Sequence, residues 1–206
     1  MIARGAGPFV FAPLLGMLPL AALALILEDP RWSYPSIPLG IAFLFSLVFF
    51  RDPYREKGPG IVSPADGRIL AADPDRGKLV VFMGIFNVHV NRAPLDGRVA
   101  SVVHTAGGHA PAYSEDAGAN ERVETVLETQ FGLVRMTQVA GVFARRIVPY
   151  VRRGDAVRKG QRIGMIRFGS RVELTLPRGV RLSVRVGDKV RAGESTVAEV
   201  VDGPRP

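Results

Sequence analysis

The stretch Val151-Arg152-Arg153-Gly154-Asp155-Ala156-Val157-Arg158-Lys159-Gly160 recurs 33 residues later (184 − 151) as Val184-Arg185-Val186-Gly187-Asp188-Lys189-Val190-Arg191-Ala192-Gly193. A repeat this short cannot bury an apolar face alone, so we expect the two copies to pair with each other as one small β unit. Between the copies lies Arg167-Phe168-Gly169-Ser170-Arg171. This position puts the Gly169-Ser170 dipeptide on the connection between two related halves, where we expect the chemistry to take place.

The chain after Phe50 consists of short runs rich in Val, Ile and Arg that are broken by Gly, Pro and Asp. Such a pattern is typical of strands joined by tight turns. Pro64-Ala65-Asp66-Gly67 and Pro94-Leu95-Asp96-Gly97 are predicted turns, because Pro presets φ and Gly tolerates a positive φ. We predict a mostly β, β-rich α+β fold with strands at residues 68–72, 78–83, 87–92, 98–104, 122–129, 133–139, 147–151, 161–168, 171–176 and 180–186.

Two apolar runs precede this β-rich region. No charged residue occurs from Gly5 to Leu27 or from Trp32 to Phe50. Each run is long enough to cross a hydrocarbon core of roughly 30 Å as a helix. The polar break Glu28-Asp29-Pro30-Arg31 is so short that the two runs are expected to form a helical hairpin. We therefore divide the chain into a membrane-anchoring hairpin, residues 1–50, and a β-rich domain, residues 51–206.

Basic residues flank the hairpin on both sides, namely Arg4 before it and Arg51, Arg55 and Lys57 after it. The positive-inside rule then places the protein in the cell membrane with the β-rich domain on the cytoplasmic face. Two other interpretations stay open. The first run could be a signal peptide with a cleavage site near Ala22-Leu23-Ala24. Alternatively, the hairpin could dip into one leaflet, an arrangement favoured by four prolines: Pro13, Pro19, Pro35 and Pro38.

Composition narrows the classes of function. Cysteine is absent, which excludes disulfides, thiol nucleophiles and cysteine zinc sites. Residues 1–50 hold two basic and two acidic residues, so the net charge of +8 lies entirely after residue 50. Such a basic domain could bind nucleic acid or an anionic membrane surface, or could simply be a solvated surface, and composition alone does not choose among them.

Histidine occurs only at His89, His104 and His109, so any general base with a near-neutral pKa must come from these three. The alternation around His89 predicts a place on one face of a strand, where a structural role is the commoner one. His104 and His109 would make only two ligands of a metal site, and we predict no metal. Taken singly, Asp66 is an ordinary turn aspartate.

Six segments taken together resemble the short prokaryotic form of phosphatidylserine decarboxylase. They occur in the family's order between Phe49 and Pro177, which is more specific than any single motif. The repeat adds to the resemblance, because this family resembles lipoyl-type barrel-sandwich domains in its C-terminal part. The six segments are Phe49–Pro53, Val62–Gly67, Phe86–Arg92, Gln138–Gly141, Ala144–Val148 and Arg167–Arg171.

The resemblance implies a proenzyme that cuts itself between Gly169 and Ser170. The products would be a β chain of residues 1–169 and an α chain of residues 170–206. In this scheme the Ser170 hydroxyl attacks the Gly169 carbonyl, His89 is the base and Asp66 orients His89. Elimination from the resulting ester converts Ser170 into an N-terminal pyruvoyl group. That group is the implied cofactor, with no metal and no pyridoxal phosphate.

The implied reaction converts phosphatidylserine into phosphatidylethanolamine and carbon dioxide through a Schiff base on the pyruvoyl group, which acts as the electron sink. His89 is also the candidate proton donor for the decarboxylated substrate. The implied partners are the phospholipid, the membrane and the two chains of one precursor, without nucleic acid, and a homo-oligomer is left open. Which arginines bind phosphate or carboxylate is not specified by the sequence.

The sequence departs from the longer members of the family at two positions. Those members carry Leu-Gly-Ser-Thr where this chain has Phe168-Gly169-Ser170-Arg171, as the short form does. They also carry a second histidine at the position of Phe86. Two alternatives stay open: a decarboxylase of another serine-headed lipid such as archaetidylserine, and a non-enzymatic membrane-anchored adaptor with a barrel-sandwich module.

Overall fold

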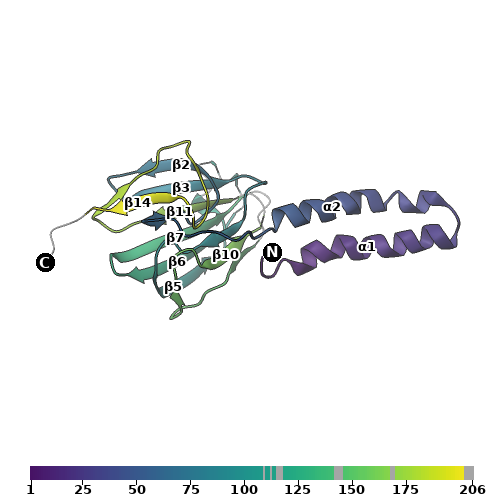
Figure 1. Ribbon diagram of the computed structural model, residues 1–206, viewed down its shortest axis with the longest axis horizontal. Coiled ribbons are helices and arrows are strands. Elements are labelled where there is room, and N and C mark those ends of the chain that lie inside the picture. The colour runs from purple at the N-terminus through teal and green to yellow at the C-terminus, as the bar shows by residue number, and fades with distance from the viewer. Residues whose placement is uncertain (109, 112, 115–117, 142–145, 168–169, 202–206) are drawn as a thin grey trace. The chain divides into compact units, whose positions relative to one another are not determined.

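The computed structural model describes residues 1–108, 110–111, 113–114, 118–141, 146–167 and 170–201 (Figure 1). The chain forms two compact units, Met1–Pro53 and Tyr54–Pro206. The first unit is helical, and the second contains strands joined by turns and loops. The predicted β-rich fold preceded by an apolar helical hairpin is therefore confirmed.

The helical unit contains α1 (Gly7–Ile26), the short 3₁₀ helix η1 (Pro30–Ser33) and α2 (Ser36–Phe49). Two segments, Gly7–Ile26 and Pro30–Phe49, are long and apolar enough to cross a membrane. The open end of the hairpin is closed by a backbone hydrogen bond of 2.8 Å from the Ala3 amide to the Phe50 carbonyl. Few side chains of the two helices are buried, namely Val10, Ser46 and Phe49, as expected of a lipid-facing surface.

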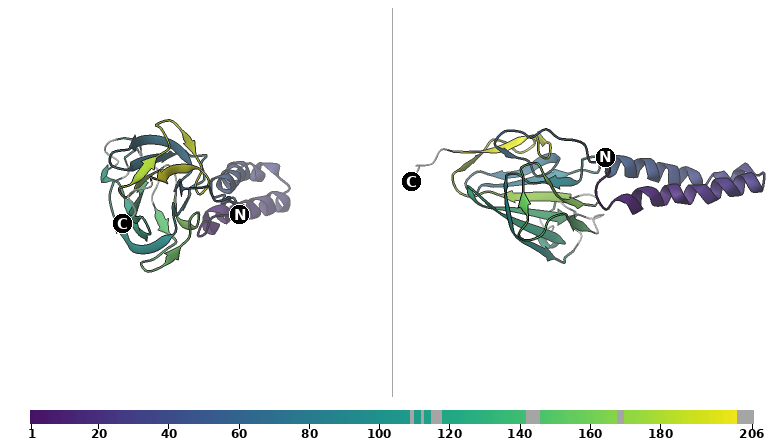
Figure 2. Two further views of the ribbon diagram at one scale, coloured as in Figure 1. Left: turned by 60° about the vertical axis from the view of Figure 1, so that its left-hand side comes forward. Right: turned by 60° about the horizontal axis from the view of Figure 1, so that its bottom comes forward.

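The β unit is organised around an antiparallel eight-stranded sheet in the order β13-β2-β3-β11-β7-β6-β5-β9. Two three-stranded sheets, β1-β14-β12 and β4-β10-β8, complete it, and the strands surround a common interior (Figure 2). The large sheet contains β13 (Lys189–Val190), β2 (Gly67–Asp73), β3 (Lys78–Met83), β11 (Ser170–Thr175), β7 (Gly132–Ala140), β6 (Arg122–Thr129), β5 (Gly97–Thr105) and β9 (Ala156–Val157). The smaller sheets contain β1 (Ile61–Val62), β14 (Thr196–Val200), β12 (Val180–Leu182), β4 (Val90–Arg92), β10 (Arg162–Ile166) and β8 (Ile147–Pro149).

Strand β11 lies in the middle of the large sheet, between β3 and β7. Buried and partly exposed residues alternate along β11, and the apolar residues Val172 and Leu174 are completely buried. The facing residues Val81 and Leu79 of β3 are equally buried. Burying each such side chain contributes about 1.5–3 kcal/mol, so the centre of the sheet is held mainly by this apolar face.

The two copies of the repeat do not pair with each other, and this prediction was wrong. Strand β9 of the first copy pairs with the start of β5, whereas β13 of the second copy pairs with the start of β2. The backbone of each copy therefore forms its hydrogen bonds with a strand that directly follows a Pro-x-Asp-Gly turn. The copies occupy the two ends of the strand order of the large sheet.

Each copy of the repeat, together with the strand that it pairs with, forms one half of the β unit. The two halves contain equivalent hydrogen bonds. The Val99 amide donates to the Asp155 carbonyl (2.9 Å), and at the matching position the Ile69 amide donates to the Asp188 carbonyl (2.9 Å). The halves also exchange equivalent bonds across their junction, from Val62 N to Pro94 O (3.1 Å) and from Arg92 N to Pro64 O (2.9 Å). The β unit therefore has an internal pseudo-two-fold relation, in which the turn carrying Asp66 corresponds to the turn carrying Asp96.

The strand predicted at 87–92 is shorter in the structure, where β4 spans Val90–Arg92. The residues before it form a turn, because the Asn87 side-chain oxygen accepts a hydrogen bond from the Gly84 amide (2.8 Å) and the Asn87 amide donates to the Gly84 carbonyl (2.9 Å). His89 consequently lies in the loop that joins β3 to β4. Its predicted place on a strand was wrong.

The close approach of β5 to β6 at Gly97 provides a test of the fold that leaves the Asp66 turn untouched. A Cβ at Gly97 would lie 2.6 Å from the Glu128 carbonyl oxygen, nearer than real Cβ atoms come. We expect Gly97→Ala to destabilise the protein by about 1–3 kcal/mol, which lowers its melting temperature by several degrees. Gly118→Ala is the control, because a Cβ there meets nothing within 4 Å. Equal melting temperatures for both variants in detergent would contradict this packing.

Candidate active site

Ser170 is the first residue of β11 and is completely buried. It lies opposite Met83 of β3 on one side and Ala140 of β7 on the other. Its hydroxyl oxygen has no hydrogen-bond partner among the described residues. A buried hydroxyl without a partner is unfavourable by about 1–3 kcal/mol, so its retention calls for a chemical reason.

Two buried amide side chains, Asn91 and Gln138, lie near the residues that pair with β11 around Ser170. The Asn91 side-chain nitrogen contacts the sulfur of Met83 (3.5 Å), and its oxygen accepts a hydrogen bond from Gln138 (2.7 Å). Gln138 lies opposite Val172, two residues along β11 from Ser170, so both side chains are on the same face of the sheet. Asn91 and Gln138 are both completely buried. They add polar groups, which can donate or accept hydrogen bonds, to an otherwise apolar face of the sheet.

His89 is almost completely buried, and the loop after β3 holds its ring. Its Nδ1 lies 2.9 Å from the carbonyl oxygen of Asn87. A carbonyl can only accept, so Nδ1 carries the hydrogen, and the neutral ring then has its lone pair on Nε2. The His89 carbonyl in turn accepts a hydrogen bond from the Ile166 amide (3.2 Å), four residues before Ser170. The loop therefore presents His89 in the tautomer of a general base.

Asp66 ends the turn before β2 and uses its two carboxylate oxygens differently. Oδ1 accepts a hydrogen bond from the Ala192 amide (2.8 Å). The matching aspartate, Asp96, does the same with the Lys159 amide (2.7 Å), so this bond belongs to the turn. Oδ2 forms an ion pair with Arg55 (2.7 Å), whose guanidinium also contacts Glu194 (3.1 Å). Oδ1 of Asp66 therefore has the ordinary role of a turn aspartate, which it shares with Asp96. Among the described residues, the ion pair of Oδ2 with Arg55 is a contact that Asp96 does not share.

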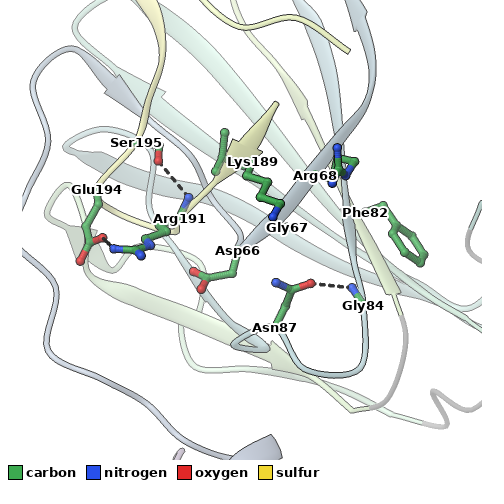
Figure 3. Close-up of a pocket in the computed structure, with 11 residues that line it drawn as sticks. Asp66, Gly67, Arg68, Phe82, Gly84, Asn87, Lys189, Arg191, Glu194 and Ser195 are labelled. Carbon is green, nitrogen blue, oxygen red and sulfur yellow. Dashed lines mark hydrogen bonds and ion pairs between the residues drawn. The ribbon is translucent and has the colours of Figure 1, made fainter. Parts of the chain in front are cut away.

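An open pocket of about 900 Å³ lies beside Asp66 and the His89 loop (Figure 3). Asp66 lines it together with Gly84 and Asn87, the two residues that close the turn before His89. Its basic lining residues are Arg68, Lys189 and Arg191. The structure thus brings Asp66 and the loop that carries His89 to one pocket whose wall can attract an anion.

Two arginines approach each other just before the Gly-Ser dipeptide. The Arg167 amide donates to the Arg146 carbonyl (3.2 Å), which continues the pairing of β10 with β8. Burial, together with the positive charge of Arg146, lowers the pKa of Arg167 from its ordinary value, although Tyr150 acts in the opposite direction. Two cations held this close favour an anion between them.

Comparison with known proteins gives the family. The model of the phosphatidylserine decarboxylase family matches residues 42–198. The chain belongs to the phosphatidylserine decarboxylase family. A phosphatidylserine decarboxylase proenzyme of Streptomyces griseus is 44% identical over 95% of this chain and 92% of its own length. A putative archaetidylserine decarboxylase proenzyme of Archaeoglobus fulgidus is 48% identical over 95% of this chain and 94% of its own length. The predicted resemblance is therefore confirmed.

Three other residues named in the sequence analysis are Gly169, from the resemblance to phosphatidylserine decarboxylase, and the two histidines weighed as metal ligands, His104 and His109. Gly169, on the predicted scissile bond, and His109 lie outside the described residues. His104 is more than half exposed and pairs with Glu121 (3.0 Å). Within the described residues, no three acidic or histidine side chains are grouped as a metal ion would require.

The sequence analysis did not assign Arg55, Asn91 or Gln138. Asn91 and Gln138 lie in segments that resemble phosphatidylserine decarboxylase, and a polar residue in an alternating apolar strand was an available signal. Arg55 had no comparable signal, because its contact with Asp66 depends on where the chain runs after the hairpin.

Proposed function

We propose that this chain is a proenzyme that cuts itself between Gly169 and Ser170 and then decarboxylates phosphatidylserine to phosphatidylethanolamine. The observation that carries the proposal is the buried Ser170 hydroxyl, which has no hydrogen-bond partner among the described residues at the start of a central strand. A protein that served only as an adaptor has no use for such a group.

The cutting step needs only groups of the chain. The Ser170 hydroxyl attacks the Gly169 carbonyl carbon while His89 Nε2 accepts the hydroxyl proton. The C–N bond then breaks, the nitrogen takes the proton, and an ester joins the two residues. A base then removes the Cα proton of residue 170 while the Cβ–O bond breaks, which releases residues 1–169 as a free carboxylate and leaves an enamine at residue 170. This enamine takes up a proton at Cβ to become an imine. Addition of water and loss of ammonia leave a pyruvoyl group at residue 170.

The surroundings of residue 170 fit such a group. A buried, planar carbonyl can replace the serine hydroxyl in a space where nothing among the described residues binds that hydroxyl. When present, the pyruvoyl carbonyl takes up the substrate amine and withdraws electrons from the bond that breaks. Met83 and Ala140 hold residue 170 from both sides. His89 is the group of this chain that we assign to returning a proton to the substrate carbon.

Substrate binding is supported by the pocket and by the loop that carries His89. The basic residues Arg68, Lys189 and Arg191 suit the phosphate and carboxylate of a serine-headed phospholipid. Ile85 and Phe86 are 45% and 72% exposed at the tip of the loop, where they suit contact with acyl chains. We also propose that α1 and α2 anchor the enzyme in the cell membrane, with the β unit on the cytoplasmic side.

Archaetidylserine is the second candidate substrate, because the relative from Archaeoglobus fulgidus carries that name at 48% identity. Its headgroup would use the same pocket. Parallel assays of the two lipids in the same detergent distinguish them, and a ratio of kcat/KM above tenfold in either direction assigns the substrate.

Mass spectrometry of the purified protein tests the proposal directly. We expect two polypeptides, residues 1–169 and residues 170–206, and a carbonyl on the smaller one that borohydride reduces with a gain of two hydrogens. An intact chain with an ordinary serine at position 170 would falsify the proposed function.

The exposed loop tip allows a separate prediction about the lipid. We expect Phe86→Ser to raise KM for phospholipid in vesicles roughly tenfold, because an aromatic side chain loses about 1.5–3 kcal/mol of apolar contact. Cutting at Gly169-Ser170 and turnover of a short-chain soluble substrate should not change. The control is Phe131→Ser, an exposed aromatic in the turn between β6 and β7 that lines neither pocket. An unaltered KM in the Phe86 variant rules out the proposed acyl contact.

A further inference from the structure

A second pocket, of about 660 Å³, has a basic lining unlike that of the pocket beside Asp66. Glu56 is its only acidic lining residue among those described. The cations that line it are Arg55, Lys57, Arg92, Arg158, Lys159 and Arg162.

The internal repeat shows how the two pockets diverged in charge. The pocket beside Asp66 is lined by Arg191, Glu194 and Ser195. The second pocket is lined by Arg158, Gln161 and Arg162. Gln161 takes the place of Ser195, because the Arg158 amide donates to the Gln161 side-chain oxygen (3.0 Å) as the Arg191 amide donates to the Ser195 hydroxyl (2.9 Å). The carboxylate of Glu194 therefore has no counterpart in the second pocket.

Three of these six cations are available to a ligand. Arg55 is already neutralised by Asp66 and Glu194, so it is not counted. Lys57, Arg158 and Lys159 form no ion pair with any described residue, and the Lys159 ammonium contacts only the Gly60 carbonyl (3.2 Å). Three cations facing one pocket repel each other, and an anion with several oxygens relieves that repulsion.

The position of the pocket in the chain indicates where the anion comes from. Its first lining residue is Tyr54, and only residues 50–53 separate it from the end of α2. Basic residues directly after a membrane helix are attracted to anionic lipid headgroups. We propose that this pocket binds the phosphate groups of anionic phospholipids at the membrane surface, as a site separate from the pocket beside Asp66.

The four lysines of the chain allow the site to be read by chemical labelling. Lys57 and Lys159 line the second pocket, whereas Lys189 lines the first and Lys78 is paired with Glu173. The full chain is inserted into phosphatidylcholine vesicles with or without phosphatidylglycerol, which contains no amine and no serine headgroup. Amine acylation is then followed at each lysine by mass spectrometry, so the readout does not depend on decarboxylation.

We expect phosphatidylglycerol to slow the labelling of Lys57 and Lys159 several-fold at low salt, and 1 M NaCl to abolish the effect. Lys78, which lines neither pocket, serves as the internal reference and should label at the same rate. The test variant is Gln161→Glu with Arg162→Ser, which lowers the charge of the pocket lining by two. It should need a several-fold higher fraction of phosphatidylglycerol for the same protection.

Uniform protection of all four lysines, or none at Lys57 and Lys159, overturns the proposal. Equal protection by inorganic phosphate at the same phosphate concentration overturns the assignment to lipid. Self-cutting of the variant reports its folding. If the double variant fails to cut, Arg158→Gln replaces it, because that side chain is exposed and forms no ion pair with any described residue.

Discussion

Ser170→Ala should leave the precursor as a single uncut chain without a reducible carbonyl and without decarboxylase activity. The loss is expected to be complete, because the hydroxyl supplies both the nucleophile and the atoms that become the cofactor. The variant chain should nevertheless fold. Its substitution removes a buried hydroxyl that has no hydrogen-bond partner among the described residues, and such a change is close to neutral or stabilising.

The measurement pairs intact mass with a thermal melt followed by circular dichroism. A cooperative melt with an uncut mass supports the role of Ser170 in the chemistry. A fragment of residues 170–206 in the variant would remove Ser170 from the cutting step. If the variant does not melt cooperatively, His89→Gln provides a second uncut chain in which the hydroxyl is present and only the base is lost.

Asp66→Asn and Asp96→Asn should give opposite results in the same cutting assay. Both aspartates accept a backbone amide hydrogen through Oδ1, from Ala192 and Lys159 respectively, and an asparagine oxygen can accept the same bond. Only Asp66 loses an ion pair, the contact of Oδ2 with Arg55. We therefore expect Asp66→Asn to slow cutting by at least about 100-fold, as for an aspartate that orients a catalytic histidine, and Asp96→Asn to cut normally.

This pair separates a chemical role from a structural one. Equal, normal cutting in both variants would reduce Asp66 to a turn residue. Equal failure of both would show that the turn itself is required. Recovery of cutting in Asp66→Glu, which restores the charge at a longer reach, would show that cutting requires a negative charge at this position.

Local patterns predicted the parts of the fold that local physics determines. Strands 78–83 and 122–129 were predicted with their observed bounds, because alternating apolar residues specify a buried face whatever the partner strand is. The two apolar helices were equally legible. The pairing of the repeat could not be predicted in this way. β13 pairs with β2, which lies more than 100 residues upstream, and no local pattern in either segment specifies its partner strand.

The sequence supplied candidate residues for the site but little of their geometry. Ser170, His89 and Asp66 came from the family resemblance. The place of His89 in a loop depends on the side chain of Asn87, which accepts the Gly84 amide hydrogen and closes a turn that alternation cannot reveal. The contact of Arg55 with Asp66 depends on the path of the chain after the hairpin, so no spacing rule could have found it.

The central place of β11 has a consequence for the products of the proposed cut. A cut before Ser170 would give a short fragment that contributes β11 to the middle of the large sheet, β13 to its edge, and β12 and β14 to a second sheet. Strands of the two polypeptides would be intermixed in both sheets, so the fragments could not separate without global unfolding. We therefore expect folding to precede cutting, and separately produced fragments not to reassemble readily into an active enzyme, because the proposed cofactor can arise only in a continuous chain.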